Sequence, residues 1–182
     1  MGQDAGMALE LRLCDRGTAQ RVMFRRRDPA VDPPWADEYP LEGDTRAVAA
    51  YVSQLPRLGG DTTSNSFGYY QVVEDGVVVG GIGFHGPPKG HVVEVGYGVV
   101  PAVRGRGVAT AALRLMLEVA RGLEGVGRVV GRTDTTNVAS QRVMMAAGMY
   151  LVTQRADFWH YEIDLEDGSG SARQAGVDPG SR

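Results

Sequence analysis

The residues with the clearest chemical meaning are Arg104, Gly105, Arg106 and Gly107, which stand directly before an alanine-rich apolar run. A helix that begins near Gly107 would present unpaired N–H groups and the positive end of its dipole to this turn. Glycines let an anion approach the backbone closely, and arginine can grip phosphate oxygens with two parallel hydrogen bonds. The stretch therefore predicts a cradle for a phosphate-bearing cofactor, with a plain surface turn as the alternative interpretation.

A dinucleotide site of the Rossmann kind is a further alternative, and the spacing argues against it. That site needs the pattern G-x-G-x-x-G, whereas Thr110 occupies the third glycine position here. It also needs an acidic residue at the end of the next strand, and the nearest acid, Glu124, precedes that strand. The sequence therefore disfavours NAD binding.

The elements around this turn are predicted from apolar periodicity. Alternating or β-rich runs predict strands, and apolar residues at helical spacing predict helices. Predicted strands lie in residues 7–15, 67–86 (a hairpin that turns at Asp75-Gly76), 91–100, 128–134 and 149–165 (two strands). Predicted helices lie in residues 18–27, 45–55, 107–122 and 137–148. The order β-α-α-β-β-β-α-β-α-β-β predicts a mixed α/β sheet covered by helices.

Two glycines, Gly96 and Gly98, interrupt the predicted strand 91–100. Glycine inside a strand is typical of a β-bulge or of a close approach by another group.

Composition limits the remaining possibilities. The 182 residues, 43% of them hydrophobic, suit one domain over 8–165, followed by a Gly- and Ser-rich stretch, 166–182, predicted to be disordered. A net charge of −3 gives no basic excess for nucleic acid. The single cysteine, Cys14, and three histidines make a disulfide or a metal site unexpected. Neither a signal-peptide pattern nor an 18-residue apolar run is found, so we expect a cytoplasmic protein that does not cross a membrane.

The segment "RGRGVA", residues 104–109, resembles the acyl-CoA loop R/Q-x-x-G-x-G/A of the GNAT superfamily of N-acetyltransferases. The preceding E-x-G-Y, residues 94–97, and the later N-x-x-S, residues 137–140, resemble the subgroup that contains ribosomal-protein N-terminal alanine acetyltransferases. The resemblance implies the GNAT fold, a mostly antiparallel sheet of six to seven strands flanked by about four helices.

The same resemblance implies an activity. GNAT enzymes move the acetyl group of acetyl-CoA to a primary amine by direct attack in a ternary complex. The acceptor would be a protein N-terminus, a lysine or a small cationic amine, and the protein a monomer or homodimer. The alternative is a catalytically silent module that binds acetyl-CoA as a sensor or docking signal.

The resemblance also implies where acetyl-CoA lies. The backbone at the end of the strand would pair with pantetheine, the turn would hold the pyrophosphate, and the next helix would add two polar contacts. The residues concerned are Val99, Val100, Arg104, Gly105, Arg106, Gly107, Val108, Ala109, Thr110, Asn137 and Ser140. Asn137 is equally expected to cap its helix.

Glu94 matches the glutamate of E-x-G-Y and is the candidate base that deprotonates the amine. It precedes Val99 by roughly 16 Å of extended strand, which suggests relay through water. A solvated or salt-bridged carboxylate is the alternative. His85, after a β-rich run, is interpreted as a strand-end residue. Many GNAT enzymes protonate the leaving thiolate with a tyrosine. Met144 occupies the corresponding position here and cannot donate a proton. The acid is therefore absent, unneeded, or replaced by Ser140 or water.

The loop 28–44 is the candidate acceptor-binding segment because its carboxylates suit a cationic amine. These carboxylates are Asp28, Asp32, Asp37, Glu38, Glu42 and Asp44. Trp35 and Tyr39 could stack on the amine or stabilise the loop, and Glu38 between them could pair with the amine. A solvated acidic loop is the alternative interpretation.

Overall fold

The computed structural model describes residues 8–54 and 66–165. These residues form one seven-stranded sheet, ordered β1-β2-β3-β4-β5-β7-β6. Its strands are β1 (Leu9–Leu13), β2 (Tyr69–Glu74), β3 (Val77–Phe84), β4 (Val92–Val99), β5 (Arg128–Asp134), β6 (Tyr150–Gln154) and β7 (Phe158–Asp164). Its α-helices are α1 (Arg16–Met23), α2 (Glu42–Gln54), α3 (Val108–Arg121) and α4 (Val138–Ala146). The predicted order of elements and the mixed α/β fold are confirmed; the stretch predicted to be disordered, 166–182, lies outside the described residues.

Local capping sets where the helices begin. The Asp15 side chain accepts the Thr18 N–H at 2.6 Å and starts α1, which ends at Met23, before the predicted Arg27. The helix α2 begins three residues before its predicted start, because the Asp44 carboxylate accepts the backbone N–H of Leu41 at 2.8 Å. Such a bond satisfies one of the unpaired donors at a helix N-terminus.

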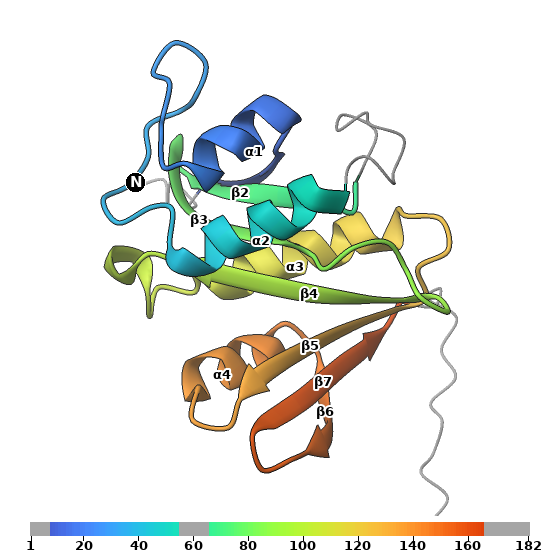
Figure 1. The fold of residues 1–182 in the computed structure, drawn as a ribbon. Helices are drawn as coiled ribbons and strands as arrows, with labels where there is room; N and C mark the ends of the chain where they lie inside the picture. The colour runs from blue at the N-terminus through green and yellow to red at the C-terminus, as the bar shows by residue number, and fades with distance from the viewer. Residues whose placement is uncertain (1–7, 55–65, 166–182) are drawn as a thin grey trace, which may run out of the picture.

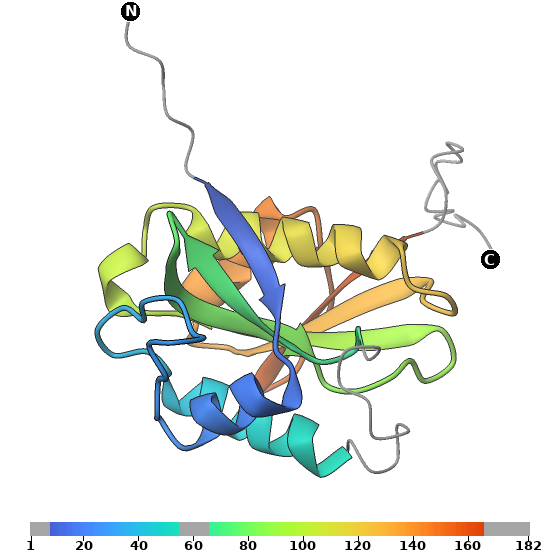
Figure 2. The ribbon, with the colours of Figure 1, turned by 90° about the horizontal axis from the view of Figure 1, so that it is seen from above.

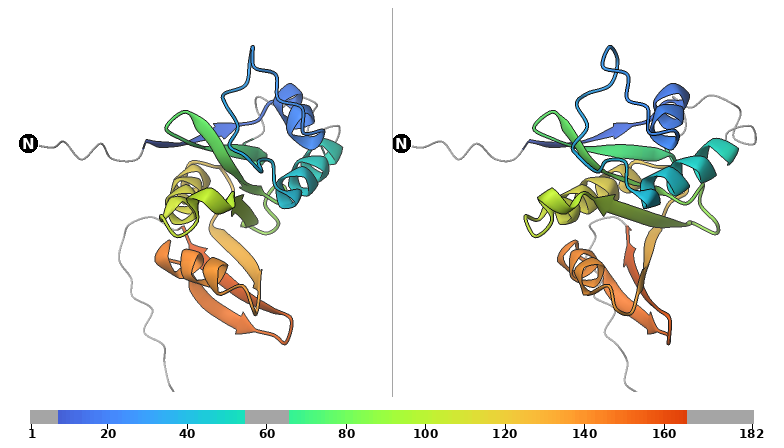
Figure 3. Two further views of the ribbon diagram at one scale, coloured as in Figure 1. Left: turned by 90° about the vertical axis from the view of Figure 1, so that its left-hand side faces the viewer. Right: turned by 60° about the vertical axis from the view of Figure 1, so that its left-hand side comes forward.

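The helices cover both faces of the sheet. Figure 2 shows α1 and α2 below the strands β1 to β4 and α3 above them. The two views of Figure 3 agree that α4 lies on the same side as α3, against β5 to β7. No helix of the described residues has the length and apolar character that a membrane crossing needs.

The core on the α3 side follows from the spacing of its apolar residues. Leu113, Met116, Leu117 and Ala120 recur at i, i+3, i+4 and i+7, and each is at most 2% exposed. Burial of each larger side chain contributes about 1.5–3 kcal/mol, so this face fixes α3 and its N-terminal turn against the sheet.

The strands β4 and β5 separate along their length. They form the one parallel pair of the described sheet, and their pairing covers only Val92–Glu94 with Arg128–Val130. Figure 1 shows the two strands together at one end and diverging toward the other. Pairing of β4 with β3 continues through Val99 without a shift of register. The bulge considered for Gly96 and Gly98 is therefore not found, and the glycines serve close approach instead.

Candidate active site

The turn before α3 ends in an open helix N-terminus. Gly105 and Gly107 have φ values of +74° and +85°, a left-handed conformation that suits glycine. Gly107 is the N-cap, no side chain caps it, and the first helical bond runs from the Ala111 N–H to the Gly107 carbonyl at 3.0 Å. A Cβ at either glycine would meet no atom within 4 Å. The N–H groups of Val108, Ala109 and Thr110 precede the first helical bond and have no acceptor within the helix, and the two glycines leave room for an anion beside them.

The two arginines of this turn have partners within the protein. Arg106 donates two hydrogen bonds to the Glu74 carboxylate, from Nη2 to Oε1 at 2.9 Å and from Nη1 to Oε2 at 3.3 Å. Arg104 donates from Nε to the Val99 carbonyl at 3.2 Å. Arg106 thus ties the turn to the end of β2, and the anion site consists mainly of backbone donors.

The outer edge of β4 is the second feature. The His85 N–H donates to the Glu94 carbonyl and the Val100 N–H to the Val79 carbonyl, both at 2.8 Å. The main-chain groups of Glu94, and of Val100 just after β4, therefore face β3. Because N–H groups alternate between the two edges of a strand, those of Val95, Tyr97 and Val99 face β5. The ladder with β5 ends at the Glu94–Val130 pair and uses the N–H of Val95, so the N–H groups of Tyr97 and Val99 are the ones free to pair with an extended ligand. The N–H of Val100 is already used.

The start of α4 lies beside this edge. Asn137 caps the helix by accepting the Ser140 N–H at 3.1 Å, as expected. The Ser140 hydroxyl lies 2.9 Å from that of Tyr97. Burial raises the pKa of Tyr97 to about 12, so it stays protonated and can donate. Met144, farther along the same helix, is buried against Gly131.

Glu94 is part of a three-residue cluster. Arg132 of β5 donates to both of its oxygens, from Nε at 3.0 Å and from Nη2 at 2.9 Å. The His85 Nδ1 lies 3.3 Å from Glu94 Oε1. The opposite ring nitrogen of His85, Nε2, lies over Gly96, 2.6 Å from where a Cβ would stand. The pairing of β3 with β4 brings His85 here, which is why its position as a strand-end residue gave no sign of this contact.

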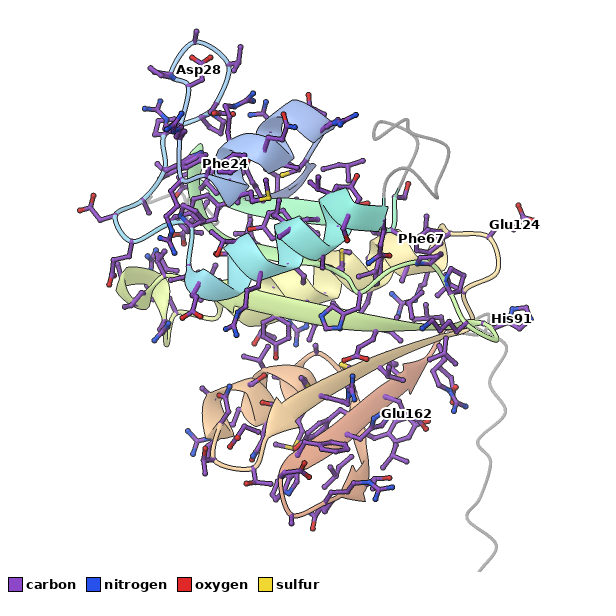
Figure 4. All side chains as sticks on the ribbon, viewed as in Figure 1. Phe24, Asp28, Phe67, His91, Glu124 and Glu162 are labelled. Atoms are coloured by element: carbon purple, nitrogen blue, oxygen red, sulfur yellow. The ribbon has the colours of Figure 1, made fainter. Side chains whose placement is uncertain are left out.

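A hollow of about 660 Å³ lies between α2 and the sheet. Its floor is formed by two glycine pairs of β3 and β4, Gly81 with Gly98 and Gly83 with Gly96. The facing side of α2 is also small, at Gly43, Ala47 and Ala50, and Figure 4 shows Phe67 beyond the C-terminal end of this helix. Small residues line both layers of the hollow, and the side chains of Tyr69 and His85 reach over Gly81 and Gly96. The other lining residues are Leu41, Asp44, Arg46, Tyr51, Gln54, Tyr69, Phe84, His85, Gly86 and Tyr97.

The predicted acceptor residues Trp35, Glu38 and Tyr39 do not line this hollow. Trp35 forms a β-bridge with Val78 and packs edge-on against Tyr39, with ring centroids 5.1 Å apart. Glu38 is exposed. The Tyr39 hydroxyl lies 3.1 Å from that of Tyr69 and so stands behind the hollow.

Of the acidic residues in loop 28–44, Asp44 alone lines the hollow. Asp32 is buried and pairs with Arg21, its Oδ2 lying 2.7 Å from Nε, which fixes the loop to α1. Figure 4 shows Asp28 at the tip of the loop, far from β4. The described residues contain no group of three or more His, Cys, Asp and Glu side chains that could hold a metal ion.

Comparisons with known proteins agree with this geometry. A family model described as an acetyltransferase (GNAT) domain matches residues 9–150. A curated N-acetyltransferase of Bacillus subtilis, YjdG, is 28% identical over 85 residues, which are 46% of this chain and 51% of that protein. The chain thus spans about half the length of this curated relative.

Solved structures share the fold. The ribosomal-protein-S5-alanine acetyltransferase of Vibrio fischeri is 16% identical with a TM-score of 0.62, over 87% of this chain and 94% of that one. The yncA protein of Salmonella typhimurium, solved with acetyl-CoA, is 21% identical with a TM-score of 0.58, over 90% of this chain and 97% of that one. The family model covers most of the chain and the strand order matches the expected fold, so the chain belongs to the GNAT family of acetyltransferases.

Proposed function

We propose that this protein transfers the acetyl group of acetyl-CoA to a primary amine. The observation that carries the proposal is the open N-terminus of α3 directly beside the diverging strands β4 and β5. The first feature suits a pyrophosphate and the second an extended chain with amide groups, and acetyl-CoA combines both.

Backbone groups would hold most of acetyl-CoA. The N–H groups from Gly105 to Thr110 would bind the pyrophosphate, which gains from the dipole of α3. The free edge of β4 at Tyr97 and Val99 would pair with the pantetheine arm in place of β5. Asn137 and Ser140 would flank the arm from α4. Arg106 would act indirectly, since its bond to Glu74 holds the turn in shape.

The acceptor amine would enter from the glycine-floored hollow, on the other face of β4. An ammonium ion has no free lone pair, so a base must take one proton before the nitrogen attacks the thioester carbonyl. Glu94 can accept the proton through His85, whose Nε2 faces the hollow while Nδ1 contacts the carboxylate. Arg132 keeps Glu94 in position. The amide N–C bond forms, the C–S bond breaks, and a free N–H of β4 can stabilise the oxyanion.

The leaving thiolate needs one proton, and the attacking nitrogen loses one as the tetrahedral intermediate collapses. Ser140 can supply the first from its hydroxyl and regain it from Tyr97, 2.9 Å away. The proton lost by the nitrogen passes to water, and water returns one to Tyr97. This pair would take the role of the tyrosine that many GNAT enzymes have at the position of Met144.

The experiment is thiol release from acetyl-CoA in the presence of a panel of primary amines, with mass spectrometry of the products. We expect an acetylated amine, and a loss of kcat of roughly 10²-fold or more in Glu94→Gln and in His85→Gln, the typical contribution of a general base. Glu124→Gln, a change of a carboxylate in the loop after α3, is the matched control. Acetyl-CoA binding with no acetylation of any amine would instead support a module that binds without chemistry.

A further inference from the structure

A buried acid stands in the wall of the hollow. Asp44, on the first turn of α2, is only 4% exposed. One oxygen accepts the Leu41 N–H at 2.8 Å, and the Tyr69 hydroxyl also donates to the carboxylate. Its other oxygen, Oδ1, lies 2.6 Å from where a Cβ of Gly81 would stand, and the Tyr69 hydroxyl lies closer still to the same point. The absence of a side chain at Gly81 therefore makes room for both the Tyr69 hydroxyl and this carboxylate oxygen at the edge of the hollow.

The protein supplies no cation for this acid. Among the described residues, Asp44 forms no ion pair with a lysine, arginine or histidine. The Arg25 guanidinium, which acts on it from a distance, donates instead to the Pro40 carbonyl at 2.7 Å. Arg46 also lines the hollow, but its side chain is 74% exposed and lies 3.7 Å from Glu42. The hydrogen bonds from Leu41 and Tyr69 are neutral and leave the charge of this buried carboxylate unbalanced, which is costly, so a cationic ligand suits the site.

The two chemical groups of the hollow stand at different places on the glycine floor. Asp44 lies over Gly81, whose partner is Gly98, whereas His85 lies over Gly96. The two positions differ by two residues along the sheet and one strand across it, a diagonal of about 9 Å. A ligand that reaches both groups therefore needs two nitrogens joined by a short spacer.

The lining defines the spacer. Glycine and alanine form the floor and the facing side of α2, and aromatic side chains such as Phe67 and Phe84 close the end near His85. Of the described Asp, Glu, Lys and Arg residues, Asp44 and Arg46 alone line the hollow. A slim aliphatic chain fits such walls without leaving polar groups unpaired.

We propose that the acceptor is a small aliphatic diamine, one ammonium of which is anchored by Asp44 while the other nitrogen is presented at His85 for acetylation. This inference rests on the proposed function and goes beyond it by naming the substrate class and the residue that selects it. The anchoring carboxylate is unused by the acetyl transfer itself.

The test compares three acceptors of one length: butane-1,4-diamine, 4-aminobutan-1-ol and butylamine. The last two keep the reacting amine but lack the second cation. With the wild-type protein we expect kcat/KM for the diamine to exceed both by roughly 30-fold or more, as for a buried charge pair that loses one member. Asp44→Asn should abolish the preference. Glu42→Gln, which removes an exposed charge two residues away, should retain it.

The outcomes separate the two proposals. A diamine no better than butylamine in the wild type, or a preference that survives in Asp44→Asn, overturns the inference and leaves acetyl transfer intact. Failure of acetyl-CoA to bind, measured by calorimetry on the same samples, overturns the proposed function itself. The wild-type comparison needs no variant, so it decides the question even if Asp44→Asn does not fold.

Discussion

Replacing Asp44 with asparagine should stabilise the ligand-free protein, because the carboxylate is kept in the hollow at a cost to folding. Burial raises the pKa of Asp44 to about 6 from an ordinary value of 3.8. At pH 7.5 the ionised carboxylate is therefore less favourable in the folded state than in the unfolded state, where water solvates it. A shift of about two units corresponds to about 3 kcal/mol, an upper limit because the asparagine amide must also be buried. We expect Asp44→Asn to raise the free energy of unfolding by about 1–3 kcal/mol.

The pH dependence gives the sign of the effect. Between pH 3.8 and about 6 the folded state binds more protons than the unfolded state at this position, so wild-type stability falls as pH rises through this window. The asparagine side chain of the variant does not titrate. The advantage of the variant should therefore be largest at pH 7.5 and about two-thirds smaller at pH 4.5.

Urea unfolding at pH 7.5 and pH 4.5 measures both quantities. Glu42→Gln is the control, because its exposed side chain should change stability by no more than about 0.5 kcal/mol at either pH. A variant less stable than the wild type at pH 7.5, or one stabilised equally at both pH values, would refute the reasoning about Asp44.

Three further substitutions test the turn before α3, the Glu94 cluster and the Ser140–Tyr97 pair. Arg106→Ala should lower the free energy of unfolding, measured in urea, by about 1–3 kcal/mol, because the buried Glu74 carboxylate loses its ion-pair partner. The double variant Arg106→Ala with Glu74→Gln should recover most of the lost stability. Arg132→Met should lower kcat by roughly tenfold or more, because Glu94 loses its anchor, while acetyl-CoA affinity measured by calorimetry stays unchanged. Tyr97→Phe should lower kcat by a similar, roughly tenfold factor in thiol-release assays if Ser140 is recharged by this hydroxyl, and an unchanged kcat would exclude that route.

The features predicted well from the sequence are those that depend on neighbouring residues. Gly107 stands at the start of α3, and Asn137 caps α4. The alternation of strands and helices also follows from local periodicity, which explains why the element order was predictable.

The features that the sequence did not reveal depend on strand register and on distant partners. Gly81 and Gly98 are far apart in the sequence, and only the register of β3 with β4 shows that they lie opposite each other. The ion pair of Arg106 with Glu74, 32 residues earlier, is not visible in the local pattern that predicted a phosphate contact for Arg106. Asp44 was one of several acids in a loop, and only the packing of α2 on the sheet distinguishes it. Such contacts are tertiary, so no local pattern encodes them.

The central claim is that the open N-terminus of α3 binds acetyl-CoA, and calorimetric titration tests it most directly. Wild-type protein would be compared with Gly107→Glu, which puts a negative charge into the anion site, and with Gly125→Glu. Gly125 is the matched control, because it also has a positive φ, +80°, and open space around it, but follows the opposite end of α3. We predict that acetyl-CoA binds the wild type and Gly125→Glu with similar affinity and does not bind Gly107→Glu. Equal binding to all three proteins, or binding to none of them, would contradict the claim.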